Sequence, residues 1–355
     1  MIQSKRNRSF AAEWDQQDGI IIAWPHAGTD WAYMLDEVTA CYVQMAQAIL
    51  QDDERLVIVA PDAQDVHDAL GADVDWQRID IIEMPTNDTW IRDYGPITLF
   101  HDGQFALADF TFNAWGMKFA ADCDNMVTSR LNERGTFKLP LLNCRDIVLE
   151  GGSIETDGNG TVMTTTCCLT APNRNDALSR EQLEQVLLDR LGCIKMLWVD
   201  HGELAGDDTD GHIDTLARFA PGGIILYTGC DDPGDEHFDA LMKMEQDLKS
   251  MTDADGNHYH LIKLPLPEAI YDEVSRLPAT YANFLVMNHQ VLVPVYGQPE
   301  NDVKACQLIG QAFPGRAVVA LDCRALICQH GSLHCATMQL PRGALGSLNS
   351  SEAVS

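Results

Sequence analysis

The chain has 355 residues, of which 46% are hydrophobic and 22% charged, a composition typical of globular proteins and not of disordered ones. Its net charge is −29, because 53 acidic residues outweigh 24 basic ones. A surface of this charge repels nucleic acid and attracts small cations. We therefore expect no nucleic-acid partner.

The sequence shows no sign of a membrane or export segment. Its apolar runs, such as residues 19–24, are far shorter than the roughly 20 residues that cross a bilayer. Residues 1–10 are basic and polar and no hydrophobic stretch follows them, so a secretory signal is not expected. The eleven cysteines include no Cys-x-x-Cys pair. We predict a cytoplasmic protein with free thiols and no membrane partner.

The predicted elements recur in a regular order. Helices are predicted where apolar residues lie three or four apart, and hairpins where two apolar strands flank a Gly or Asn turn. In chain order, the pattern predicts a helix at 36–50, a strand at 56–60, hairpins at 94–110 and 152–165, a helix at 179–191, a strand at 195–199, a hairpin at 213–227, a strand at 261–264, a hairpin at 281–295, a helix at 302–313, and strands at 317–321 and 333–340.

The hairpins repeat with a period of about 60 residues. Asp93, Glu150, His212, Tyr281 and Cys335 mark the starts of the copies and lie 57, 62, 69 and 54 residues apart. Five strand-strand-helix-strand units can close into a ring that exposes no long sheet edge. An unrelated α/β assembly with accidental spacing is the alternative that the pattern leaves open. No linker divides the chain, so we predict one domain over residues 1–345 and a short polar tail over 346–355.

Polar, reactive residues gather at the starts of the hairpins, at 87–96, 149–153, 206–214 and 329–335. A ring-shaped fold brings such segments to its axis. Strand alternation predicts that His212 and Asp214 point to the same side. Neighbouring glycines allow the backbone to approach a ligand closely.

Metal and phosphate sites fit these segments poorly. Residues 206–214 do not match an EF-hand, because Gly206 falls where the first acidic ligand belongs. His212, Asp214, His334 and Cys335 could bind zinc by residue type, but paired-ligand spacing is missing. No papain-type signature and no Gly-rich phosphate loop occurs. We expect no metal and no cofactor.

The same residue types suit a guanidinium substrate. A guanidinium is a planar cation with five N–H donors, which Asp93, Glu150 and Asp214 could bind in pairs. Trp90 and Trp115 could stack on the cation or line its alkyl arm. A thiolate is the strongest nucleophile available at neutral pH. The histidine of the third segment could then carry protons to the leaving ammonia and from water.

Several motifs in order resemble one known family. They are residues 12–14, 23–26, 87–96, 112–116, 149–153, 173–175, 201–202, 210–214, 278–284, 313–316 and the segment that ends at Cys335. Over most of its length the chain is similar to the agmatine deiminases, in the family that also holds the Porphyromonas-type peptidylarginine deiminase. The resemblance implies an α/β fold, a five-bladed pentein propeller of strand-strand-helix-strand repeats.

The resemblance also implies a deiminase activity that converts agmatine and water to N-carbamoylputrescine and ammonia. It implies that Cys335 is the nucleophile, which forms an amidino-cysteine intermediate, and that His212 is the general acid and base. The carboxylates that it implies at the guanidinium are Asp93, Glu150 and Asp214, and the aromatic pocket residues are Trp90 and Trp115. The family further implies a homodimer.

The chain departs from the family pattern at two places. Asp208 stands where agmatine deiminases usually carry Glu, a carboxylate that faces the distal amine of the substrate, so selectivity for agmatine stays open. Residues 329–332 replace a run of glycines before the nucleophile. Asp88 and Asp210 are expected to be structural, and Arg92 to be an internal ion-pair partner.

Two other functions remain to be weighed. A peptidyl- or free-arginine deiminase would use the same cysteine, histidine and carboxylates, although free arginine needs a cationic group for its own carboxylate and the candidate segments are acidic. A non-catalytic guanidine- or polyamine-binding protein would not require both Cys335 and His212.

Overall fold

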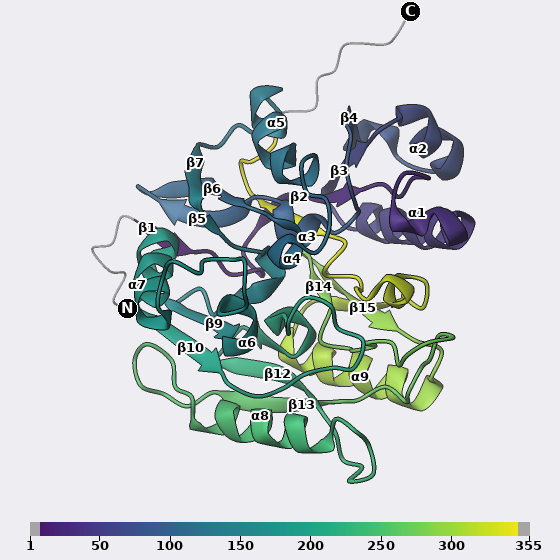
Figure 1. Cartoon of the computed structure of the whole chain (residues 1–355). Coiled ribbons are helices and arrows are strands. Elements are labelled where there is room, and N and C mark those ends of the chain that lie inside the picture. Colours follow the sequence, from purple (N-terminus) through teal and green to yellow (C-terminus); the bar gives the residue numbers. More distant parts are fainter. Residues whose placement is uncertain (1–7, 347–355) are drawn as a thin grey trace, which may run out of the picture.

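Five mixed sheets carry the strands of the structure, a computed structural model that describes residues 8–346 (Figure 1). From edge to edge they are β1-β5-β6-β7 (Arg8–Phe10, Ile97–His101, Gln104–Thr111, Leu141–Val148), β10-β9-β8 (Lys195–Val199, Thr161–Thr165, Ile154–Thr156), β11-β12-β13 (Ala217–Ala220, Ile224–Gly229, His260–Pro265), β14-β15-β16 (Leu285–Val286, Gln290–Val295, Ala317–Asp322) and β17-β2-β3-β4 (Met338–Pro341, Gln17–Ala23, Arg55–Ala60, Ile79–Glu83).

Each sheet has the same internal plan. A middle strand pairs antiparallel with the strand before it and parallel with the strand that follows, as β12 does with β11 and β13. In the last sheet, β17 from the end of the chain lies antiparallel to β2 from its beginning, with Met338 opposite Ile21. β2 then pairs parallel with β3. The fifth unit is therefore completed by the two ends of the chain, and the α/β class is confirmed.

Helices connect the strands and cover the sheets on the outside. In Figure 1, α1, α7, α8 and α9 lie at the periphery, whereas the short α3 and α4 lie near the centre. The helices are α1 (Leu35–Gln51), α2 (Ala63–Leu70), α3 (Ile91–Tyr94), α4 (Ala114–Met117), α5 (Val127–Glu133), α6 (Thr166–Leu169), α7 (Arg180–Leu191), α8 (Phe238–Ser250) and α9 (Pro299–Ala312). Single turns of 3-10 helix occur at η1 (Asp30–Met34), η2 (Trp76–Arg78), η3 (Asp124–Met126), η4 (Gly151–Ser153), η5 (Ile213–Thr215) and η6 (Leu326–Gln329).

The predicted helices at 36–50, 179–191 and 302–313 are confirmed as α1, α7 and α9. Ser179 begins α7 with a capping box, in which its side chain accepts from the Gln182 amide and the Gln182 side chain accepts in return. The four predicted connecting strands are confirmed as β3, β10, β13 and β16. Helix α8, between β12 and β13, was not predicted.

The strands that follow the polar segments begin later than predicted. Residues 213–215 form the 3-10 turn η5 and β11 starts only at Ala217, so the strand alternation predicted for His212 and Asp214 was wrong. The reason is local hydrogen bonding. The His212 amide donates to the hydroxyl of Thr209, and the Leu216 amide donates to the carbonyl of Ile213. These bonds satisfy the backbone within a turn, where a strand would need a neighbour.

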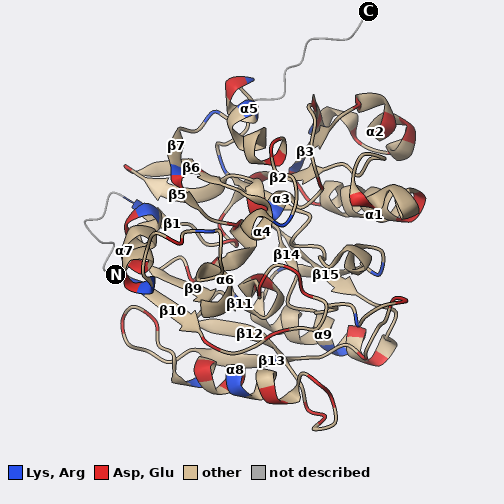
Figure 2. Ribbon diagram, viewed as in Figure 1, with Lys and Arg blue, Asp and Glu red and all other residues tan. Residues whose placement is uncertain are grey.

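Charges are distributed over the outside of the molecule. In the ribbon of Figure 2, acidic residues occur along the outer helices, α1, α2, α8 and α9 among them. The buried core is built from the strands, and Ile20, Ile21 and Ile22 of β2 are fully inaccessible. Within residues 8–346 no helix combines the length and apolar character that crossing a bilayer requires. Of the predicted C-terminal tail, residues 347–355 lie outside the described residues.

Candidate active site

A cavity of about 200 Å³ opens where the polar segments meet. It is strongly acidic. Five aspartates line it: Asp30, Asp88, Asp93, Asp207 and Asp208. Among the described residues of its wall, none is lysine or arginine, and two histidines are the only basic side chains. The cavity is therefore suited to a cationic ligand.

The structure brings six of the eight predicted site residues to the wall of this cavity: Asp93, Trp90, Trp115, Asp208, His212 and Cys335. They come from segments far apart in the chain, which the sheets hold with their polar ends together. Glu150 and Asp214 do not line the cavity but lie directly behind it, in contact with residues that do.

Cys335 follows η6 and is nearly buried, with 7% of its surface exposed. Its Sγ lies 3.6 Å from Asp214 Oδ2 and accepts a hydrogen bond of 3.2 Å from the side-chain amide of Asn283. Burial, together with the charges of Asp214 and Asp93, raises the pKa of this thiol well above its usual range. In the free protein the cysteine is thus a neutral thiol, and an arriving cation would favour the thiolate.

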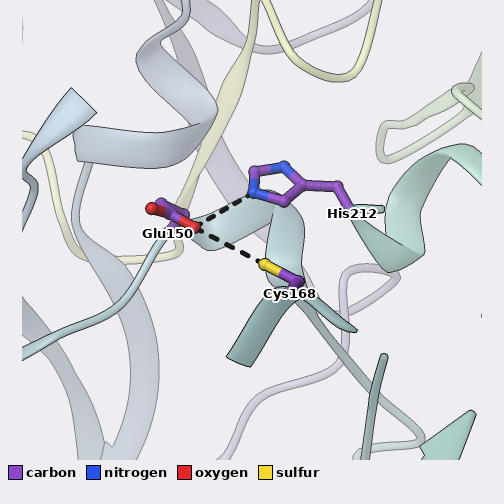
Figure 3. A group of neighbouring side chains, drawn as sticks. All are labelled: Glu150, Cys168 and His212. Carbon is purple, nitrogen blue, oxygen red and sulfur yellow. Dashed lines mark hydrogen bonds and ion pairs between the residues drawn. The ribbon is translucent and has the colours of Figure 1, made fainter. Parts of the chain in front are cut away.

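His212 lies next to the carboxylate of Glu150, which supports it (Figure 3). Its Nε2 is 3.2 Å from Glu150 Oε2, and its Nδ1 is 3.7 Å from Asp93 Oδ1. Burial alone would lower the pKa of His212, but the charges of Asp93 and Cys168 and the bond to Glu150 hold it well above its usual value. The imidazole is therefore protonated at neutral pH and can donate a proton.

Glu150 is fully buried, and both of its carboxylate oxygens have hydrogen-bond partners. Arg174 Nε lies 3.0 Å from each oxygen, and the Cys168 thiol is 3.7 Å from Oε2, as Figure 3 shows for the thiol. The sequence resemblance had implied that Glu150 binds the guanidinium itself. In this structure its oxygens contact His212 and Arg174, which fixes the orientation of the imidazole, and its contact with a guanidinium stays a prediction.

Asp93, in α3, faces the cavity with both oxygens already oriented. Its Oδ2 accepts from the indole of Trp115 at 2.9 Å, and its Oδ1 accepts from the Gly152 amide at 2.9 Å. Burial raises the pKa of Asp93 to about 6, with His212 opposing and Asp214 adding to the shift. A Cβ on Gly152 would lie 2.6 Å from His212 Nδ1, so a glycine is required where these side chains converge.

Two buried polar atoms at this point have no hydrogen-bond partner among the described residues. They are His212 Nδ1 and Asp214 Oδ1. Buried polar atoms are normally satisfied, so an unsatisfied pair beside the thiol marks the place of a ligand that supplies a donor and an acceptor. A ligand with N–H groups would supply the donor that Asp214 Oδ1 lacks, and an atom with a free lone pair would supply the acceptor that a protonated His212 Nδ1 lacks.

The aromatic walls are rigid. Trp115 adopts a left-handed backbone conformation with φ 55°, and Asn113 accepts a hydrogen bond from the Gly116 amide in the same turn. Trp90 packs against Gly331, where a Cβ would approach its ring to 2.3 Å. Gly331 belongs to the segment in which the chain departs from the family's glycines.

Asp88, which we expected to be structural, lines the cavity with Asp208. Burial raises the pKa of Asp88 to about 7, opposed by its bond from the Thr89 amide and increased by Asp30 and Asp208. Asp88 thus accepts a bond from its neighbouring amide, as expected of a structural residue, and also lies in the cavity wall. Its place in the wall was not expected from the sequence.

Comparisons with known proteins agree with this geometry. The profile of the Porphyromonas-type peptidyl-arginine deiminases matches residues 9–341. The chain belongs to this family. It is 33% identical to an agmatine deiminase of Pseudomonas syringae pv. tomato over 354 aligned residues, which cover 93% of this chain and 94% of that one.

Solved structures of family members have the same fold. A protein of Porphyromonas gingivalis named as a candidate arginine deiminase is 50% identical and superimposes with a TM-score of 0.91, covering 96% of this chain and all of that one. A substrate-bound agmatine deiminase of Campylobacter jejuni (C. jejuni) is 35% identical with a TM-score of 0.89, over 95% and 97% of the two chains. The family fold is thus shared over nearly the whole chain.

Proposed function

We propose that this family member is an agmatine deiminase, which converts agmatine and water to N-carbamoylputrescine and ammonia. The observation that carries the proposal is the acidic cavity with Cys335 at its end. Agmatine has a guanidinium at one end and an ammonium at the other. Both ends are cations, and the cavity offers carboxylates along its length and no lysine or arginine among its described lining residues.

The guanidinium would bind between Asp93 and Asp214, with its carbon facing Cys335. Asp93 lines the cavity, and Asp214 has its unpartnered Oδ1 beside the thiol. Bidentate pairs between a guanidinium and carboxylates are geometrically specific, so they orient the carbon for attack. The distal ammonium would bind Asp208 and Asp88, which lie close enough to each other to interact electrostatically.

In the first half of the reaction, the bound cation stabilises the Cys335 thiolate, and the thiol proton is lost to solvent. The thiolate forms a C–S bond to the guanidinium carbon. His212 donates its proton to one terminal nitrogen, the C–N bond breaks, and ammonia leaves. An amidino-cysteine remains, and His212 is now neutral.

In the second half, a water molecule attacks the amidino carbon and His212 accepts its proton. The C–S bond breaks with its electron pair on sulfur, which restores the thiolate, and the second proton of the water is lost to solvent. The oxygen therefore stays on carbon as the neutral ureido group of the product. Glu150, bound to His212 Nε2 at 3.2 Å, keeps the imidazole oriented through both steps.

We also infer that the five sheets are the blades of a closed pentein propeller. Two observations support this. All five sheets share one pairing plan, and the two ends of the chain meet in one sheet, where β17 completes the unit that β2 begins, as a closed ring of blades requires. The single catalytic domain over residues 1–345, the homodimer and the cytoplasmic location remain predictions from the sequence.

An assay of ammonia and ureido product with agmatine, free arginine and a peptidyl-arginine side by side tests the function. We expect agmatine to be preferred by at least about tenfold in kcat/KM, since each 1.4 kcal/mol of charge preference is tenfold. Arg174 and Lys118 lie nearby, but both bind Asp210, at 2.7 and 2.9 Å. Neither is therefore free to bind a substrate carboxylate. Equal processing of arginine would favour the arginine deiminase alternative.

A further inference from the structure

We propose that His334, the residue before the nucleophile, is a positioning residue: it holds one oxygen of Asp214 and thereby leaves the other oxygen for the guanidinium. This inference rests on the proposed function for its substrate. It concerns a buried cluster of Glu13, Arg218 and His334 that lies behind Asp214 and that the proposed mechanism does not use.

The contact between His334 and Asp214 is short and buried. His334 Nδ1 lies 2.8 Å from Asp214 Oδ2, and both side chains are essentially inaccessible. Although burial acts to raise it, the pKa of Asp214 stays below its usual value because His334 donates a hydrogen bond to it. An ionised carboxylate only accepts hydrogen bonds, so the proton of the imidazole is on Nδ1.

The other nitrogen of His334 is fixed from the N-terminal segment. Its Nε2 lies 3.0 Å from Arg218 Nη2 and 2.8 Å from Glu13 Oε1, while Arg218 Nη2 also donates to Glu13 at 2.5 Å. Arg92 completes the cluster with a 3.1 Å ion pair to Glu13, which confirms its predicted role. Burial and the charges of Arg218 and Arg92 lower the pKa of His334, whereas Glu13 and the bond to Asp214 raise it. Nε2 lies between the guanidinium of Arg218 and the carboxylate of Glu13, so the ring is held in place from this side as well.

The two oxygens of Asp214 therefore have different roles. Oδ2 is held by His334 and lies 3.6 Å from the thiol, whereas Oδ1 is buried with no partner in the described chain. Without the Nδ1–H donor, the carboxylate is free to rotate and to take up a proton. The guanidinium would then lose a fixed acceptor beside the sulfur, which lowers the rate more than the folding stability.

Two variants, each with an amide in place of one ring nitrogen, test the roles of Nδ1 and Nε2 of His334 separately. His334→Asn places an amide near the former Nδ1 and keeps a donor for Asp214. His334→Gln places its amide near the former Nε2, keeps the contacts with Glu13 and Arg218, and leaves Asp214 without a donor. We expect His334→Gln to lower kcat/KM by about 10- to 100-fold more than His334→Asn, the range for one buried charge-assisted hydrogen bond.

The pH profile gives a second readout that a structural role would not move. Loss of the donor raises the pKa of Asp214, so the carboxylate stays protonated to higher pH and the acid limb of kcat/KM shifts upward in His334→Gln. Asp214 faces His212 as well as His334, and His334 faces Glu13, Arg92 and Arg218. The other four groups, His212, Glu13, Arg92 and Arg218, are the same in His334→Asn and His334→Gln, so a shift seen only in His334→Gln is assigned to the Asp214 donor.

Leu241→Ala, a core change in α8, is the matched control for stability, because Leu241 is buried and does not line the cavity. We expect the melting temperature of Leu241→Ala to fall while the acid limb of its kcat/KM profile stays unchanged. Equal losses in the Asn and Gln variants, or losses that only follow melting temperature, would overturn the positioning role.

Histidine NMR on the ¹⁵N-labelled wild type tests the same assignment without turnover. We expect His334 to carry a proton on Nδ1. Protonation on Nε2 alone would contradict the inference even if the protein were inactive with agmatine. Conversely, a wild type that processes only another guanidine removes the proposed substrate but not the positioning role, because the variants are then compared on that guanidine.

Discussion

Cys335 is a neutral thiol until a cation binds, because burial and the neighbouring carboxylates raise its pKa. This arrangement protects the nucleophile from unselective reaction and makes its activation depend on the substrate charge. It also explains why the nucleophile lies beside two carboxylates, an unfavourable place for a thiolate in an empty site.

Cys335→Ser should abolish turnover while the protein stays folded, since an alcohol at neutral pH is a far weaker nucleophile. We expect a loss of at least about 1,000-fold in kcat with an unchanged melting temperature. Rapid quench followed by mass spectrometry should detect the amidino adduct on Cys335 of the wild type. A serine variant that retains more than a few per cent of the activity would remove Cys335 from the mechanism.

Asp208→Asn should weaken the binding of agmatine through its distal amine. A charge pair near a surface contributes about 1–4 kcal/mol at a separation near 4 Å, so the KM for agmatine should rise about tenfold or more. Butylguanidine, which has no distal amine, is the matched substrate, and its KM should barely change. Equal effects on both guanidines would place the distal amine elsewhere in the cavity.

At the scale of elements, the 3-10 turn η4 brings Gly152 under three catalytic side chains. A Cβ there would lie 2.6 Å from His212 Nδ1, 2.9 Å from Asp93 Oδ1 and 3.1 Å from Asp214 Oδ2. Such distances force the side chains apart, whereas the turn itself can accept alanine, because Gly152 has no left-handed backbone conformation.

Gly152→Ala should therefore keep its fold and lose about 100-fold or more in kcat/KM, since a displacement near 1 Å at a reacting centre has this size of effect. Gly310→Ala on α9 is the control, because its nearest neighbour is a valine methyl at 3.1 Å and it is not in the cavity wall. Circular dichroism and steady-state kinetics measure the two outcomes. Normal activity in Gly152→Ala would show that these side chains have room to move.

At the scale of the whole molecule, the acidic charge is neutralised where it is buried and left free where the ligand binds. Glu150 is bound by Arg174, and Glu155 and Glu13 are bound by Arg218. The carboxylates of the cavity wall have no such arginine. The cavity wall thus keeps acidic charge that no arginine or lysine of the wall neutralises, which suits a cationic ligand.

A chelator should leave the activity unchanged. Three groups of side chains in the described chain have metal-ligand spacing, and two of them include Glu150 or Glu13, whose arginine partners oppose a metal cation. The third, Asp52, Asp53 and His289, lies outside the cavity wall. Assays with and without EDTA, followed by addition of single divalent metals, check this. Inactivation that one metal reverses would revive the zinc hypothesis for His212, Asp214, His334 and Cys335.

The sequence alone determined the repeat order, three of the long helices (α1, α7 and α9), four connecting strands and the segments that carry polar residues, because these depend on local periodicity and turn residues. It also determined the family, since the motifs occur together and in order. The sequence did not predict helix α8 or the late start of β11. At β11, a turn whose backbone forms its own hydrogen bonds competes with strand pairing, and the pattern of apolar residues does not decide between the two.

Only the tertiary structure decided which partner each carboxylate oxygen of the site contacts. Glu150 lies behind His212 because Arg174, 24 residues later, takes up its oxygens, and Asp88 opens to the cavity because Asp208 and Asp30 are brought beside it. Asp214 keeps one oxygen free because His334, 120 residues away, holds the other. Contacts of this separation depend on how the sheets are assembled and not on local spacing, so no motif in the sequence expresses them.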